Sequence, residues 1–250
     1  MKNREINVDR SFPLISIVIP AYNEEQNISS CLDALIKQKT NRKFEVIVVD
    51  NNSSDKTAEV ASSYQGQLNL RVASEKQKGR GSARWRGFRE ASGAIILSTD
   101  ADGSVPEYWV EKLLSIFVDE IRISAVTGTC KITDNYFLTN ALFNFFQPFS
   151  MKIYKIFFGH YWLNGFNFAI RRAAYIESGG FDPRLNVQED IDLSFKVSRV
   201  GRIKFMPDLS VTVSGRRFKK GLISGTVSYI KTFVSYFWLR RNVVYLDDPR

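Results

Sequence analysis

The sequence predicts an α/β protein built on a doubly wound, mostly parallel sheet. Short runs rich in Val and Ile alternate with segments whose apolar residues recur at helical spacing, as in parallel strands joined by right-handed crossover helices. The runs are apolar at nearly every position, which is typical of strands covered on both faces. Polar side chains follow several runs directly, at the sheet edge where ligands bind in this class.

The predicted elements alternate in order through the first half of the chain. Strands are predicted at residues 14–19, 44–49, 68–73 and 94–98. Helices are predicted at residues 24–37, with Asn23 as the N-cap, at 55–64, at 81–91 and, further on, at 189–200. Because no repeat or low-complexity linker interrupts this order, we expect one domain over residues 1–250. Its expected parts are a ligand-binding half (14–104), a second half (105–215) and a basic extension (216–250).

Two apolar segments in the second half of the chain allow more than one interpretation. Residues 135–162 are rich in Phe at helical spacing, but Lys, Asn and Pro148 interrupt them before a membrane-spanning length is reached. This segment is either a helix packed against the sheet or its ligand-binding edge, or a surface that contacts lipid or a lipid-linked substrate. Residues 222–246 predict an amphipathic helix, which docks on the protein or lies at a membrane surface.

Composition limits the partners. The net charge of +9 favours anions such as nucleotide phosphates and anionic membranes. The basic residues match no nucleic-acid-reading module, so we expect no specific nucleic-acid partner. The polar N-terminus lacks the apolar core of a signal peptide, and the widely separated Cys31 and Cys130 predict buried, reduced thiols. We therefore expect a cytoplasmic protein, at most bound to the inner membrane face. The single histidine, His160, excludes a His-rich metal site.

Two carboxylates end the run at residues 94–98. Asp100 and Asp102 are separated by Ala101, so in an extended chain both point to the same side. Hard oxygen ligands of this kind suit Mg²⁺ or Mn²⁺ carrying a phosphorylated substrate. The alternative is that the two aspartates only cap the next helix.

Three other loops are predicted at the same edge. After the first strand, Tyr22 offers a ring for stacking and Glu24 a carboxylate, although acidic first-turn residues are also ordinary helix starts. After the second strand, Asp50 can accept a hydrogen bond from a nucleobase, although an Asx turn with Ser54 or Asp55 as helix cap also explains it. The basic, glycine-rich turn at 76–84 opens a helix and is a weak anion-binding signal.

Taken in order, these loops resemble the family-2 glycosyltransferases, which are inverting enzymes of the GT-A fold that use nucleotide-diphosphate sugars. The motifs that carry the resemblance are IVIPAYNE at 17–24, VVDNNSSD at 48–55, DAD at 100–102, GFNFAIRR at 165–172, GGFD at 179–182 and EDID at 189–192. The ordered set spans about residues 14 to 206 and is far more specific than any single motif.

The resemblance implies a Rossmann-like nucleotide-sugar-binding half over residues 14–104, an acceptor and catalytic half over residues 105–215, and a role for each matching position. Asp102, assisted by Asp100, would bind Mn²⁺ or Mg²⁺ on the diphosphate, and Asp190, in the Glu189-Asp190 pair, would be the general base. The residues expected to bind the nucleotide sugar are Pro20, Ala21, Tyr22, Glu24, Asp50, Asn52, Lys78, Gly79, Arg84, Asp100 and Ala101. A UDP-sugar is the commonest donor in the family, and the expected acceptor is a glycan or a lipid-linked hydroxyl, in glycan, cell-envelope polysaccharide or glycolipid synthesis.

The sequence departs from the family pattern at two places. Trp85 stands where relatives often carry asparagine, and a C-terminal histidine metal ligand found in some relatives can only be His160 or is absent. The acidic residues at 189–192 also fit dipole-favourable helix capping. The alternatives to an enzyme are a catalytically inactive nucleotide-sugar- or glycan-binding relative and, with less support, a basic nucleic-acid-binding protein.

Overall fold

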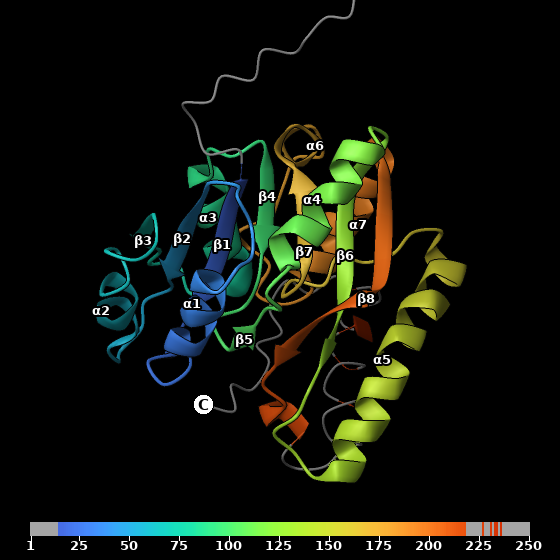
Figure 1. Cartoon of the computed structure of the whole chain (residues 1–250). Helices are drawn as coiled ribbons and strands as arrows, with labels where there is room; N and C mark the ends of the chain where they lie inside the picture. Colours follow the sequence, from blue (N-terminus) through green and yellow to red (C-terminus); the bar gives the residue numbers. More distant parts are fainter. Residues whose placement is uncertain (1–14, 219–226, 228–230, 232, 235, 237–250) are drawn as a thin grey trace, which may run out of the picture.

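The structure, a computed structural model, describes residues 15–218 together with residues 227, 231, 233, 234 and 236. Its strands form one eight-stranded sheet in the order β3-β2-β1-β4-β7-β6-β8-β5, with helices on both faces (Figure 1). The strands are β1 (Ile15–Ala21), β2 (Phe44–Asp50), β3 (Leu70–Ser74), β4 (Ile95–Ser98), β5 (Gly103–Ser104), β6 (Ile123–Lys131), β7 (Phe168–Arg171) and β8 (Arg202–Val213). The helices are α1 (Ile28–Ile36), α2 (Thr57–Ser62), α3 (Arg80–Glu90), α4 (Trp109–Asp119), α5 (Phe137–Phe158), α6 (Arg172–Glu177), α7 (Glu189–Val200) and the 3₁₀ turn η1 (Arg216–Phe218).

The predicted parallel half is confirmed. β1 pairs in parallel with both β2 and β4, and β2 pairs in parallel with β3. Alternate side chains of β1 enter different cores: Ile17 packs with the α1 side of the sheet, and Val18 packs with the α3 side. Both are fully buried. This double burial explains why the strands are apolar at nearly every position.

The second half of the sheet is mixed. β7 runs antiparallel to β4 and β6, while β6 and β8 are parallel and β5 is an antiparallel edge strand. β1, β2, β4 and β6 therefore point the same way, and their carboxyl ends share one edge of the sheet. The loops after β1, β2 and β4 carry the predicted site residues to that edge.

Several predicted boundaries were wrong by a few residues. The first helix begins at Ile28 rather than at residue 24, and Asn23 is not its N-cap. Instead the Asn23 side chain accepts a hydrogen bond from the Ser54 N–H at 2.9 Å, so it joins two loops of the edge. The second helix begins at Thr57 with Lys56 as its N-cap, so neither Ser54 nor Asp55 is the cap, although the Asp55 carboxylate accepts the Thr57 N–H at 3.0 Å. Cys31 and Cys130 are buried free thiols, as predicted.

α5 is the longest helix in the described part of the chain and lies along the lower right of the molecule (Figure 1). Among the described residues, no helix combines the length and the hydropathy needed to cross a membrane. The amphipathic helix predicted at 222–246 lies almost wholly outside the described residues.

Candidate active site

The carboxyl-terminal edge of the sheet brings predicted carboxylates from separate loops together through Arg216. The guanidinium group of Arg216 contacts Glu24, after β1, at 2.7 Å and Asp102, after β4, at 2.9 Å. Arg216 lies in η1, which follows β8. Residues from three distant parts of the sequence thus meet in one ion-pair network.

Asp100 and Asp102 lie in the tight turn that follows β4. The Gly103 N–H donates to the Asp100 carbonyl at 3.0 Å and closes this turn. Burial and the neighbouring charge of Asp100 raise the pKa of Asp102 to about 6, although Arg216 opposes the shift. Ala101 is 2% exposed and packs in the core, so its side chain anchors the turn, leaving its backbone as the part that can face a ligand.

Arg84 connects this turn to the Glu189-Asp190 pair. Its Nη2 lies 2.7 Å from an Asp100 carboxylate oxygen, and its Nε lies 3.7 Å from Glu189 Oε1. The residue is 2% exposed, and a Cβ at Gly165 would come within 2.3 Å of its Nη2. A side chain at position 165 would therefore displace the Arg84 guanidinium group. The predicted binding residue Arg84 therefore bridges two carboxylate pairs inside the protein.

Asp190 and Glu189 differ in exposure although they are neighbours at the start of α7. Glu189 is buried next to Arg84, and burial together with the Asp190 charge raises its pKa to about 7. Asp190 is half-buried, and its carboxylate accepts the N–H groups of Gly165 at 3.2 Å and Ile191 at 2.8 Å. Burial also raises the pKa of Asp190. Asp190 is thus held by two backbone donors while remaining partly open to solvent.

Asp50 ends β2 at the same edge. One of its carboxylate oxygens, Oδ1, is buried without a hydrogen-bond partner in the described structure. A buried acceptor left unpaired is costly, and a nucleobase N–H is a donor that would satisfy it. Pro20 and Ala21, at the end of β1, lie opposite Val49 and Asp50 in the strand register.

The glycine-rich turn before α3 is organised by Asn51, which the sequence analysis did not select. Its amide donates to the carbonyls of Glu75 at 3.0 Å and Gln77 at 2.8 Å, and accepts the Gly79 N–H at 2.7 Å. Gly79 has φ +144°, a conformation that side-chain-bearing residues rarely adopt. The neighbouring Asn52, which was selected, is exposed with φ 63°. A buried asparagine directly after a strand was the available signal, since an amide can satisfy several backbone groups at once.

The same turn presents Lys78 toward the loop after β1. The Lys78 ammonium group donates to the Tyr22 hydroxyl at 2.8 Å and lies 4.2 Å from the centre of the Tyr22 ring. Two predicted binding residues from different loops are therefore in contact.

His160 is not brought to the carboxylates by any contact in the described structure. Its ring packs against Tyr154 and Phe195, and Nδ1 lies 3.0 Å from the Tyr161 carbonyl. Among the described residues, no three His, Cys, Asp or Glu side chains cluster to form a metal site by themselves.

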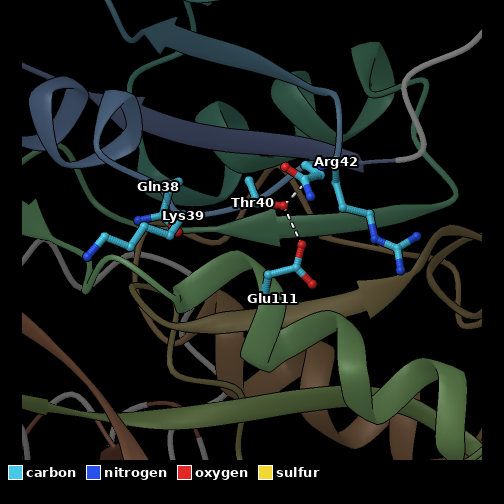
Figure 2. A pocket seen from close by; sticks show the side chains of 6 residues that line it. Gln38, Lys39, Thr40, Arg42 and Glu111 are labelled. Atoms are coloured by element: carbon cyan, nitrogen blue, oxygen red, sulfur yellow. Dashed lines mark hydrogen bonds between the residues drawn. The ribbon is translucent and has the colours of Figure 1, made fainter.

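A separate hollow of about 820 Å³ is lined by Gln38, Lys39, Thr40, Asn41, Arg42 and Glu111. Figure 2 shows the hydrogen bond between Thr40 and Glu111 that crosses it. None of the predicted site residues lines this hollow.

Comparison with known proteins agrees with the geometry of the edge. Residues 16–179 match the model of the family described as "Glycosyl transferase family 2". Glycosyltransferase AglE of Haloferax volcanii is 40% identical over 126 residues, covering 49% of this chain and 41% of that protein. The probable glycosyltransferase YdaM of Bacillus subtilis is 28% identical over 212 residues, covering 79% of this chain and 50% of that protein. The chain thus spans half or less of the length of these curated relatives.

Solved structures share the fold. The complex of S. aureus TarS 1-349 with UDP-GlcNAc superposes with a TM-score of 0.64 at 23% identity, covering 80% of this chain and 58% of that one. The mannosyltransferase PcManGT from Pyrobaculum calidifontis, in complex with GDP-Man and Mn²⁺, gives a TM-score of 0.64 at 23% identity, covering 88% of this chain and 64% of that one.

Proposed function

The chain belongs to glycosyl transferase family 2, and on that premise we propose that it is an inverting enzyme that moves a sugar from a nucleotide-diphosphate sugar to an acceptor hydroxyl. The single observation that carries the proposal is the Arg84 bridge, with Asp100 at 2.7 Å on one side and Glu189 at 3.7 Å on the other. One side chain therefore contacts Asp100, a member of the predicted leaving-group pair, and Glu189, the neighbour of the predicted base Asp190. A donor bound at the first pair would therefore have its sugar beside the second.

The donor is proposed to bind along residues 14–104. Asp50 Oδ1 is the acceptor for a base N–H, and the Tyr22 ring is a surface for stacking beside the Lys78 charge. The Lys78 charge and the positive end of the helix dipole at the start of α3, next to Gly79, favour the negative diphosphate. A uridine donor is the first expectation, and a guanosine donor is the alternative, because solved relatives bind UDP-GlcNAc and GDP-Man.

Asp100 and Asp102 fit a divalent cation that is shared with the donor. Mg²⁺ is commonly held by one or two carboxylates plus substrate phosphates, so two carboxylates suffice. Burial and the charge of Asp100 raise the pKa of Asp102 even with Arg216 in contact, so a bound divalent cation would favour its charged form. When bound, Mn²⁺ or Mg²⁺ would stabilise the negative charge that develops on the departing diphosphate.

Asp190 is the proposed base. It takes the proton of the acceptor hydroxyl as that oxygen bonds to the anomeric carbon, and the bond from that carbon to the diphosphate breaks in the same displacement. The Gly165 and Ile191 N–H groups fix the direction of its carboxylate. Its raised pKa makes it a stronger base than an ordinary aspartate. Glu189 is buried beside Arg84 and is proposed to position that guanidinium group.

Residues 105–215 are proposed to hold the acceptor, a hydroxyl of a glycan or of a lipid-linked glycan. The reaction is placed in the cytoplasm or at the inner membrane face, which agrees with the buried free thiols Cys31 and Cys130. The alternative of a catalytically inactive relative loses support, because both the Asp100/Asp102 pair and the Glu189/Asp190 pair are present at one edge.

The test compares Asp190→Asn with Asp192→Asn. Asp192 lies on the same helix but pairs with Lys196 at 2.8 Å and accepts the Tyr236 hydroxyl at 2.9 Å. Release of UDP or GDP from a panel of nucleotide sugars is measured with Mn²⁺ or Mg²⁺. Asp190→Asn should lower the rate by about 10²–10⁴-fold, the usual contribution of a general base, whereas Asp192→Asn should stay within a few fold. Equal losses in both variants, or turnover of no donor by the wild type, would reject the proposal.

A further inference from the structure

The apolar face of α5 points away from the protein. With 3.6 residues per turn, side chains spaced by three and four residues form one stripe along a helix. The stripe consists of Leu138, Leu142, Phe145, Phe149, Ile153 and Ile156. Every member is exposed, from 36% for Leu142 to 79% for Ile156. We call this stripe the α5 face.

The side of α5 that faces the protein carries asparagines as well as apolar and aromatic residues. Asn144 donates to the Ile132 carbonyl at 3.0 Å and accepts the Ile132 N–H at 2.9 Å, and Asn140 donates to the Asn135 carbonyl at 2.9 Å. Met151 and Tyr154 are its buried anchors. On an ordinary surface helix the apolar stripe faces the core and the exposed side is polar. Because hydrogen bonds fix the rotation of α5, the outward direction of the α5 face is built into the fold.

The charge of α5 is consistent with one class of partner. Residues 137–158 contain no Asp or Glu, and their two basic residues, Lys152 and Lys155, are exposed. Lys152 lies at one edge of the α5 face, and Lys155 lies further round on the same side, with its ammonium group 4.8 Å from the centre of the Tyr161 ring. An apolar stripe bordered by lysines is the pattern of a helix in the plane of a membrane, where the lysine stems extend to anionic headgroups.

We propose that the α5 face docks on an anionic lipid surface, with the helix axis parallel to it. At 22 residues the helix is about 33 Å long, and it fails the criteria for a membrane-crossing helix. Two copies of the chain paired through the α5 face would bring four lysines together with no acidic residue on either helix. A lipid surface supplies the missing negative charge.

Docking would also place the candidate site near the membrane. Asn135, just before α5, donates to the Gly215 carbonyl at 2.8 Å, and the Phe143 ring lies 4.9 Å from the Phe218 ring. Gly215 and Phe218 flank Arg216, which contacts Asp102. The start of α5 is therefore fastened to the loop that carries Arg216. A membrane-bound acceptor for this site rests on the proposed function, whereas the docking of the α5 face does not.

The first experiment is co-sedimentation of the full chain with vesicles of phosphatidylcholine, alone or mixed with phosphatidylglycerol. The wild type should sediment with the mixed vesicles at low salt. Phe145→Ser combined with Phe149→Ser should weaken binding at least about tenfold for each phenylalanine, and Lys152→Glu with Lys155→Glu at least about fivefold for each lysine. The matched controls are Ile121→Ser with Ile176→Ser, which are exposed apolar residues elsewhere, and Lys37→Glu with Lys112→Glu.

The second experiment measures the polarity around the α5 face. A polarity-sensitive fluorophore is attached at Phe149→Cys, with Ile121→Cys as the control, since the native thiols are buried. Emission at position 149 alone should shift to the blue when mixed vesicles are added. A blue-shifted signal without lipid means that the protein covers the face itself, and a dimer that the Phe145/Phe149 variant dissociates means that a second copy does. Either result, or equal vesicle binding by the control and test variants, overturns the proposal.

Discussion

The two carboxylate pairs of the candidate site share Arg84 but differ in their other partners. Asp100 and Asp102 follow a strand and lie within reach of two arginines, Arg84 and Arg216. The pair at the start of α7 has Arg84 on Glu189, while Asp190 is held by backbone N–H groups. Side-chain cations can be exchanged for another cation, whereas backbone donors keep a carboxylate oriented. The difference suits the first pair to bind a charged donor and the second to accept a proton.

Arg84→Met should have the largest effect on stability among the variants of the two carboxylate pairs. It removes the cation shared by both pairs and leaves the buried Glu189 without its partner. Loss of one member of a buried ion pair typically costs about 3–5 kcal/mol, so the free energy of unfolding in urea should fall by this order at a pH above 7, where Glu189, with its pKa of about 7, is mainly ionised. The control is Arg86→Met, which removes a half-buried i,i+4 pair with Glu90 at the protein surface and should cost no more than about 0.5 kcal/mol. Similar losses in both variants would show that Arg84 is not the bridge.

Arg216→Gln tests whether a metal ion can replace the Arg216 guanidinium group between Glu24 and Asp102. The variant leaves Glu24 and Asp102 without the guanidinium group that joins them, and hydrogen bonds to charged groups contribute about 1.5–3 kcal/mol. The melting temperature should therefore fall, and Mn²⁺ should restore more of it than it adds to the wild type, because a second cation can bind the same carboxylates. If Mn²⁺ shifts the two proteins equally, Arg216 and the metal do not share a site.

Glu189→Gln tests the buried member of the second pair through pH. The folded-state pKa of Glu189 is raised to about 7 from the ordinary 4.5, so the native state binds its proton more tightly than the unfolded chain. Its contribution to stability is therefore present below about pH 4.5 and is lost as pH rises toward 7. The free energy of unfolding of Glu189→Gln relative to the wild type should increase through that window. A difference that stays flat between these pH values would contradict the raised pKa.

Local pattern predicted the parallel half of the sheet because strands buried on both faces must be apolar at each position, as Ile17 and Val18 are. The same logic placed Asp50, Asp100 and Asp102 at one edge. It could not predict that Arg216 would reach Glu24, which is 192 positions away, because such pairing depends on how loops close over the edge.

Other features of the site depend on contacts between residues far apart in the sequence, which a local pattern does not contain. Arg84 was expected to bind the nucleotide sugar, but local pattern did not predict its burial between Asp100 and Glu189, beside Gly165. Asn23 was expected to cap a helix, but its amide bonds the loop after β2. For α5, the sequence left open whether the segment packs on the protein or contacts lipid, and the Asn144 hydrogen bonds to Ile132 with the buried Met151 and Tyr154 set the side that turns inward.

The central claim is that one pair binds the donor and the other accepts the proton. It is tested most directly by measuring donor affinity and transfer rate in Asp102→Asn and Asp190→Asn, with the donor identified in the panel and Mn²⁺ present. Asp102→Asn should abolish Mn²⁺-dependent binding of the donor in titration calorimetry. Asp190→Asn should bind the donor as the wild type does while transfer falls by about 10²–10⁴-fold. Unchanged donor affinity in Asp102→Asn, or near-normal transfer by Asp190→Asn, would contradict the division of roles.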